Sequence, residues 1–198
     1  MATVTGNTMV LKPSEKTPTT TMMLAEMSLE AGLPPGVCNV VHGAKDCVNF
    51  ICDDPTIRSI SFVGSNQAGE HIHARGTAAG KRVQANMGAK NHATVLPDAD
   101  KESTLNAIVG AAFGAAGQRC MALSVAVFVG DTKEWIPELA EKAAELKVGP
   151  GCDESVSVGP MISPEALARA EAIIEDATSG PNGSATLLMD GRGVSVDG

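Results

Sequence analysis

The chain has 198 residues, of which 43% are hydrophobic and 19% are charged, a composition that excludes disordered and fibrous proteins. Its formal net charge of −8, with scattered Lys and Arg residues, argues against a nucleic-acid-binding surface, which is normally basic. No apolar stretch reaches the roughly 18 residues that a membrane-spanning helix needs, so we expect neither a nucleic-acid partner nor a membrane span.

The first half of the chain alternates strand-like and helix-like patterns. Strands are predicted at 8–12, 37–41, 57–63 and 83–87, and helices at 19–31, 45–52 and 67–79. This order predicts a mostly parallel sheet with helices on its faces. Right-handed crossovers then place a ligand at the carboxyl ends of the strands.

The second half of the chain continues the alternation of strand-like and helix-like patterns. Strands are predicted at 93–96 and 124–129, and helices at 105–116, 134–146 and 164–176. We place a domain boundary near residues 88–92, which gives one domain over 1–88 and another over 89–198. The predicted fold class is α/β throughout.

The cysteines are odd in number and form no CxxC pair: Cys38, Cys47, Cys52, Cys120 and Cys152. This usage predicts a reducing compartment rather than a disulfide framework. Residues 1–11 contain no Lys or Arg, so no signal or transit peptide is predicted in this chain.

No metal site is predicted. His71 and His73 are two residues apart on a predicted helix and therefore point in different directions. Cys47 and Cys52 lack a partner pair, which makes core packing the better interpretation.

The strongest local signal is the segment 113–120, which reads Phe-Gly-Ala-Ala-Gly-Gln-Arg-Cys. A predicted helix runs into small residues and then presents Arg119 and Cys120 before the next strand. A thiol at such a turn is accessible to substrate, and nearby positive charge or backbone N–H groups favour the nucleophilic thiolate. The alternative for any single cysteine is a small buried core residue.

Four segments together resemble the aldehyde dehydrogenase family, and within it the CoA-acylating methylmalonate-semialdehyde dehydrogenases. They are the nucleophile segment at 113–120, the cofactor-binding strand and turn at 6–15, the phosphate-side turn at 60–69 and the connecting segment at 84–92. The resemblance covers essentially the whole chain, and the spacing between the four segments is preserved. It implies a parallel Rossmann-like NAD-binding sheet in 1–88 and part of an α/β catalytic domain in 89–198.

The resemblance also implies which residues bind NAD. The segment 64–69 lies between a strand and a helix, so Ser65 and the N–H groups at the start of the helix can contact the pyrophosphate. Lys12 and Glu15 follow a strand end, where a cation and a carboxylate can hold ribose hydroxyls, although a solvated turn is the alternative. The implied NAD-binding residues are Lys12, Glu15, Lys16, Phe62, Gly64, Ser65, Met87 and Gly88.

Asn86 stands at the position where, by the resemblance, hydrolytic aldehyde dehydrogenases carry a Glu that activates the thioester-cleaving water. An Asn side chain cannot accept a proton at neutral pH, and losing a general base removes roughly 10²–10⁴ of rate. The thioester therefore persists until coenzyme A, the family's acyl acceptor, takes the acyl group. The alternative is that Asn86 only makes a local hydrogen bond.

Arg119, beside the candidate nucleophile, has two interpretations. It pairs with a local carboxylate for structure, or it binds the carboxylate of the substrate, which a guanidinium fits bidentately. The resemblance favours substrate binding, which would select malonate-type semialdehydes.

The implied function is NAD-dependent oxidation of methylmalonate or malonate semialdehyde to an acyl-CoA through a thioester on Cys120, in valine and pyrimidine catabolism. The backbone N–H of Cys120 and a side-chain amide would hold the oxyanion. The full-length family forms homo-oligomers, dimers or tetramers, which are mitochondrial in eukaryotes and otherwise cytoplasmic.

Two alternatives stay open. One is a hydrolytic aldehyde dehydrogenase that uses another base. The other is a non-catalytic piece that only binds dinucleotide or full-length subunits. The family's second oxyanion donor, an Asn, and its Glu for the nicotinamide ribose have no counterpart within 1–198, so we expect a fragment with little activity alone.

Overall fold

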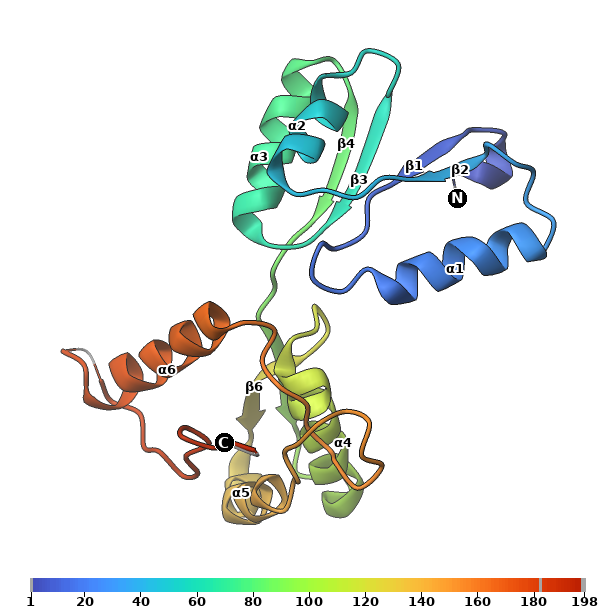
Figure 1. The fold of residues 1–198 in the computed structure, drawn as a ribbon. Helices are drawn as coiled ribbons and strands as arrows, with labels where there is room; N and C mark the ends of the chain where they lie inside the picture. Colours follow the sequence, from blue (N-terminus) through green and yellow to red (C-terminus); the bar gives the residue numbers. More distant parts are fainter. Residues whose placement is uncertain (1, 182, 197–198) are drawn as a thin grey trace. The chain divides into compact units, whose positions relative to one another are not determined.

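The computed structural model describes residues 2–181 and 183–196, which divide into two compact units, 1–88 and 89–198. Strands and helices alternate along both units (Figure 1). None of the helices in the described part of the chain combines the length and the apolarity that crossing a bilayer requires.

The first unit begins with a parallel strand pair. A short 3-10 helix, η1 (Thr3–Thr5), precedes β1 (Met9–Leu11), which pairs with β2 (Cys38–Val40) from Met9 opposite Cys38 to Leu11 opposite Val40. The helix α1 (Thr19–Glu30) crosses between the two strands. Gly32 follows this helix with a φ of 97°, a left-handed conformation that glycine adopts without steric cost.

The second part of this unit is a strand pair covered by helices. β3 (Ser59–Val63) pairs in parallel with β4 (Arg82–Asn86), and α3 (Asn66–Ala78) crosses between them. α2 (Lys45–Asp53) packs beside α3, as Figure 1 shows.

The buried face of α3 carries two glycines that let the helix approach the strands closely. Gly69, Ile72 and Gly76 are its buried residues. A Cβ atom at Gly76 would lie 2.8 Å from Cγ2 of Val83 on β4, so a side chain there would push the helix outward.

The strands of the first unit form two separate pairs rather than one sheet. β1 bonds to β2 and β3 bonds to β4, and no hydrogen-bonded register joins the pairs among the described residues. The predicted α/β class and the parallel direction of the strands are confirmed, with the strands of the first unit in two separate pairs.

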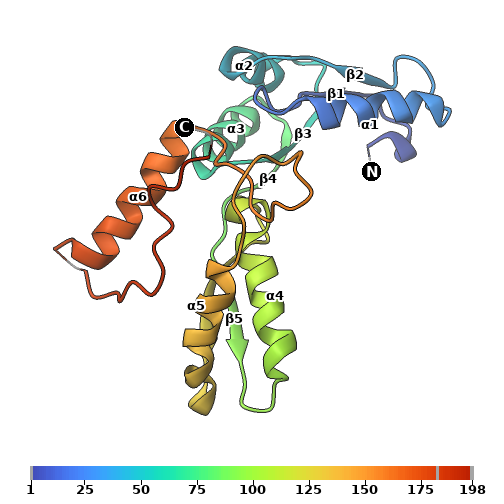
Figure 2. The same ribbon diagram turned by 60° about the horizontal axis from the view of Figure 1, so that its bottom comes forward.

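The second unit is also built on a parallel strand pair. β5 (Asn91–Val95) pairs with β6 (Leu123–Phe128), and α4 (Lys101–Phe113) crosses between them. After η3 (Gly130–Trp135), helix α5 (Ile136–Ala144) packs against α4, and Figure 2 shows these two helices beside β5.

The last helix is α6 (Pro164–Ser179). Its N-cap residue is Ser163, whose Oγ accepts a hydrogen bond from the backbone N–H of Ala166 at 3.3 Å. This capping satisfies one of the N–H groups that a helix start leaves unpaired.

Every predicted helix and strand is present within a few residues of its predicted range. The largest differences concern the helix predicted at 105–116. It begins at Lys101, because Asp100 accepts from the N–H of Ser103 as an N-cap. It ends at Phe113, because the next residues leave the right-handed conformation.

Candidate active site

The segment before Cys120 turns left-handed directly after α4. In η2 (Gly114–Gly117), Ala115 and Ala116 both have a φ of 53° and Gly117 has a φ of 68°. A left-handed alanine costs roughly 1–2 kcal/mol, so neighbouring contacts must hold this turn in place. The turn delivers Cys120 to an exposed position just before β6.

The exposure of Cys120 distinguishes it from a core thiol. All five cysteines are free, and Cys120 and Cys152 are the exposed ones. Cys52 is fully buried, and burial raises the pKa of its thiol. The core-residue alternative therefore applies to Cys52 and not to Cys120.

Arg119 bonds to the end of α4. Its Nε donates to the carbonyl of Gly114 at 3.1 Å and its Nη2 to the carbonyl of Gly110 at 3.2 Å. Within 2–181 and 183–196, no carboxylate forms an ion pair with this guanidinium. The bonds use one edge of the guanidinium, and the outer edge, Nη1 with the second N–H of Nη2, keeps donors for an anion.

Gln118 ties the turn to a distant segment. Its Nε2 donates to the carbonyls of Ala115 at 3.2 Å and Pro160 at 3.3 Å, and its Oε1 accepts from the N–H of Ile162 at 2.9 Å. Both ends of the amide are therefore used, and the turn is joined to the residues that precede α6.

Asn91, the first residue of β5, contacts the other side of the candidate nucleophile, Cys120. Its Nδ2 donates to the carbonyl of Cys120 at 2.7 Å and to the carbonyl of Ala122 at 2.9 Å. The backbone of the cysteine is thereby bonded to a residue 29 positions earlier in the chain.

In the first unit, Lys12 and Glu15 come together beyond the end of β1. Lys12 Nζ lies 3.7 Å from a carboxylate oxygen of Glu15 and donates to the carbonyl of Gly43 at 3.0 Å. Gly43 follows β2, so the lysine bridges the carboxyl ends of both strands. Lys16 is exposed, and its backbone N–H donates to Ser14 Oγ at 3.2 Å.

The start of α3 forms a second cluster of predicted residues. Ser65 is the N-cap residue, and its Oγ accepts from the N–H of Ala68 at 3.3 Å. The N–H groups of Asn66 and Gln67, at the first positions of the helix, have no intrahelical acceptor. Phe62 covers Gly64, where a Cβ atom would lie 2.5 Å from Cζ of the ring.

The residues after β4 lie against this same helix start. Asn66 Oδ1 accepts from the backbone N–H of Gly88 at 2.8 Å. A Cβ atom at Gly69 would lie 2.5 Å from Cγ of Met87. The structure thus brings Met87 and Gly88 to the cluster that contains Ser65.

Asn86 is the last residue of β4. Its backbone carbonyl accepts from the N–H of Gly64 at 3.1 Å. Its exposed carboxamide makes no hydrogen bond with residues 2–181 or 183–196, so the local hydrogen bond considered as an alternative is not formed by its side chain.

Three amides that the sequence did not single out shape these clusters: Asn66, Asn91 and Gln118. Each stands beside the end of a predicted helix or strand, which is a weak signal because amides are common in turns. Among the described residues, no group of three His, Cys, Asp or Glu side chains is arranged to hold a metal.

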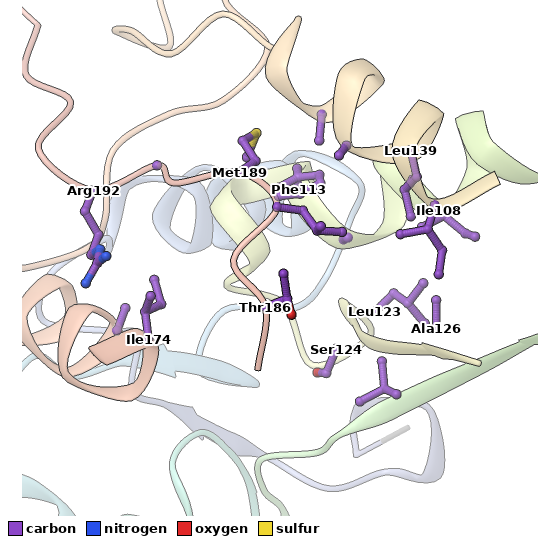
Figure 3. Close-up of a pocket in the computed structure, with 18 of the residues that line it drawn as sticks. Ile108, Phe113, Leu123, Ser124, Ala126, Leu139, Ile174, Thr186, Met189 and Arg192 are labelled. Atoms are coloured by element: carbon purple, nitrogen blue, oxygen red, sulfur yellow. The ribbon is translucent and has the colours of Figure 1, made fainter. Parts of the chain in front are cut away.

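The second unit also contains an apolar cavity of about 640 Å³ (Figure 3). Its lining includes Ile108, Leu123, Ile174 and Met189. Arg192 lies at the cavity with its guanidinium bonded to carboxylates of Asp190 and Glu175. Cys120 is not among the residues that line this cavity.

Comparison with known proteins identifies the relatives of this chain. The sequence model of the aldehyde dehydrogenase family matches residues 1–197. A mitochondrial protein of Dictyostelium discoideum, described as a methylmalonate-semialdehyde/malonate-semialdehyde dehydrogenase (acylating), is 59% identical over the whole chain. The human protein of that description is 56% identical over the whole chain.

Solved structures give the same relationship. A methylmalonate-semialdehyde dehydrogenase from Oceanimonas doudoroffii matches 98% of this chain and 39% of its own, with a TM-score of 0.90 and 45% identity. A Sinorhizobium meliloti protein described as the same enzyme, in complex with NAD, matches equal shares with a TM-score of 0.90 and 41% identity. The chain spans about 37% of the Dictyostelium protein and 36% of the human protein.

Proposed function

The chain belongs to the aldehyde dehydrogenase family, and from this premise we propose that it supplies the nucleophile and NAD-binding residues of a CoA-acylating methylmalonate/malonate-semialdehyde dehydrogenase. The observation that carries the proposal is the exposed thiol of Cys120 at the end of a left-handed turn that three side chains hold. A fixed, accessible thiol is what addition to an aldehyde carbon requires.

The thiolate of Cys120 attacks the aldehyde carbon, forming a C–S bond and an oxyanion. The backbone N–H of Cys120 is a hydrogen-bond donor for this oxyanion. NAD⁺, when bound, accepts the hydride that leaves the same carbon, and the product on Cys120 is a thioester. The thiol of coenzyme A then loses its proton to solvent and attacks the thioester carbon, and its new C–S bond replaces the bond to Cys120, which leaves as the thiolate.

The described residues of the first unit fit the dinucleotide. The N–H groups at the start of α3, with Ser65 as its N-cap, suit a pyrophosphate because a helix start carries partial positive charge. The neighbouring Gly64 leaves room for the ring of Phe62, which lies against it. Lys12 and Glu15, held 3.7 Å apart, suit the ribose hydroxyls, and Lys16, Phe62, Met87 and Gly88 complete the proposed NAD site.

Asn86 supports coenzyme A rather than water as the acyl acceptor. Its carboxamide offers no basic group that could activate a water molecule at neutral pH, and a hydrolytic mechanism would have to find another base. We therefore assign the release of the acyl group to a thiol.

Arg119 supports a substrate that carries its own carboxylate. Its Nε and one N–H of Nη2 hold backbone carbonyls of α4, which fixes the plane of the guanidinium. The outer edge of that plane presents two parallel N–H groups, which match a carboxylate bidentately. This arrangement favours malonate-type semialdehydes over uncharged aldehydes.

By the same relationship we propose a homo-oligomer as the working assembly. We also propose a mitochondrial location for a eukaryotic source, because the eukaryotic relatives carry that location in their descriptions.

The reactivity of Cys120 tests the proposal. We expect iodoacetamide to alkylate Cys120 at least tenfold faster than Cys152, which is also exposed in the same unit and serves as an internal control. Peptide mass spectrometry measures both rates in one sample, and a Cys120→Ser variant confirms the assignment. Equal rates for the two thiols would contradict an activated nucleophile at Cys120.

A further inference from the structure

The two hydrogen bonds of Asn91 occur where the strand pair of the second unit is irregular. Asn91 lies opposite Leu123, but the next residue, His92, lies opposite Val125, so Ser124 is an extra residue on β6. A bulge of this kind interrupts the regular ladder. The extra residue lies four positions after the candidate nucleophile, Cys120.

The Asn91 side chain supplies two hydrogen bonds just before the strand pairing begins. The carbonyl of Ala122 lies directly before Leu123, the first residue of β6, and that of Cys120 lies two residues earlier. Both carbonyls accept from Nδ2 of Asn91. A primary amide has two N–H donors, so one side chain can satisfy both carbonyls at once. Asn91 therefore fixes the Cys120–Met121 and the Ala122–Leu123 peptide groups.

The opposite side of Cys120 is fixed independently. Gln118 is bonded to Pro160 and Ile162, and Arg119 is bonded to the end of α4. Before β6 begins, the C-terminal side of the thiol has a backbone bond, from the N–H of Ala122 to the carbonyl of Arg119 at 3.0 Å. Without Asn91 this turn bond would remain, but the carbonyl of Cys120 would lose its bond to the Asn91 side chain.

We propose that Asn91 is a positioning residue that holds the Cys120 thiol in its reactive placement by fixing the cysteine's own carbonyl. The inference rests on the proposed function of Cys120 as the nucleophile. A carbonyl held at 2.7 Å restricts the backbone rotation that would otherwise carry the thiol and the Cys120 N–H through several orientations.

The test compares variants of the 198-residue chain in the ratio of alkylation rates, Cys120 to Cys152, with iodoacetamide as the probe. Asn91→Asp keeps the shape of the side chain but replaces both donors with acceptors that face carbonyl oxygens. Asn91→Ala removes the side chain. We expect both variants to lower the ratio at least fivefold, toward equal reactivity of the two exposed thiols.

A matched control is Asn39→Ala. Asn39 Nδ2 also donates to a backbone carbonyl, that of Gly36 at 2.8 Å, but in the first unit and away from any candidate nucleophile. We expect this variant to leave the ratio of rates unchanged. If Asn91 only stabilised the fold, its variants would lower the melting temperature and leave the ratio unchanged in the folded protein, which would overturn the proposal.

Asn91→Ser keeps one donor on a shorter side chain and serves if the alanine variant does not fold. It should give a ratio between those of the wild type and Asn91→Asp, and a ratio equal to that of the wild type would count against the positioning role. Failure of the proposed function looks different, because the wild type itself would then alkylate Cys120 no faster than Cys152.

Discussion

Gly110 and Gly114 flank the end of α4, and both supply carbonyls to the guanidinium of Arg119. Their surroundings differ. A Cβ atom at Gly114 would lie 1.5 Å from Nη2 of Arg119, whereas one at Gly110 would meet nothing within 4 Å. The absence of a side chain at Gly114 therefore allows Arg119 to lie against the turn that precedes Cys120.

We expect Gly114→Ala and Gly110→Ala to have opposite effects on the free energy of unfolding. Gly110→Ala should stabilise the chain by about 0.5–1 kcal/mol, because alanine is the better residue inside a helix. Gly114→Ala should destabilise it by about 1 kcal/mol, because its methyl group displaces Arg119 from two carbonyls.

Denaturant unfolding measures both changes, and the same substitution in an Arg119→Ala background is the control. There Gly114→Ala should no longer destabilise the chain, because no guanidinium remains to be displaced. An unchanged cost in that background would show that the contact with Arg119 is not the cause.

At the scale of elements, α2 and α3 are joined by a bidentate ion pair. Nε and Nη2 of Arg75 donate to the two carboxylate oxygens of Asp53, each at 2.7 Å. His71 and Asn49 bond across the same helix pair at 2.7 Å. The hydrogen bonds from Arg75 hold the pKa of Asp53 below its usual value of 3.8.

The pKa of Asp53 gives the sign of a pH effect on stability. A lowered pKa in the folded state stabilises the fold above the unfolded-state pKa, and this stabilisation is lost as the pH falls through the folded-state pKa. We expect Asp53→Asn to lower the melting temperature at pH 7, and we expect its difference from the wild type to shrink as the pH falls below about 4.

Melting curves between neutral and acidic pH measure this difference. Glu70→Gln on α3 is the control, because Glu70 forms no ion pair within the described ranges. The difference in melting temperature between Glu70→Gln and the wild type should not shrink in this way as the pH falls. A gap between Asp53→Asn and the wild type that stays constant down to pH 3 would refute a role for the charge.

At the scale of the whole molecule, the surface is larger than that of two compact domains. Taken separately, the two units expose at least 13584 Å² in sum. This total is a lower limit, because any contact between the units would already have hidden surface from it. Two compact domains of about 10 kDa each would expose about 10,600 Å². Large apolar side chains contribute to the excess, among them Met121 at 79%, Val63 at 68% and Phe50 at 63% exposure.

We therefore expect the isolated 198-residue chain to form NADH from malonate semialdehyde only slowly. Hydride transfer and thioester formation need a site that excludes water, and both Cys120 and the start of α3 are open to solvent.

NADH absorbance with and without coenzyme A is the measurement, and Cys120→Ser gives the background rate. Fast formation that requires coenzyme A would contradict the expected slow rate. Fast formation without coenzyme A would further indicate that water takes the acyl group despite Asn86.

The sequence by itself determined the order and approximate bounds of the helices and strands, because periodicity, glycines and caps act between neighbours in the chain. It also singled out the candidate nucleophile segment at 113–120, whose residues are consecutive in the chain. The N-cap role of Ser65 follows from its place between a predicted strand and helix.

Only the tertiary structure decided which residues hold that segment. The partners of Asn91, Gln118 and Arg119 lie 29, 42 and 9 residues away along the chain, and no local pattern specifies a contact over such a separation. The division of the first unit into two strand pairs is of the same kind. Strand periodicity determines which face a side chain occupies, whereas the path of the whole chain determines which strands meet.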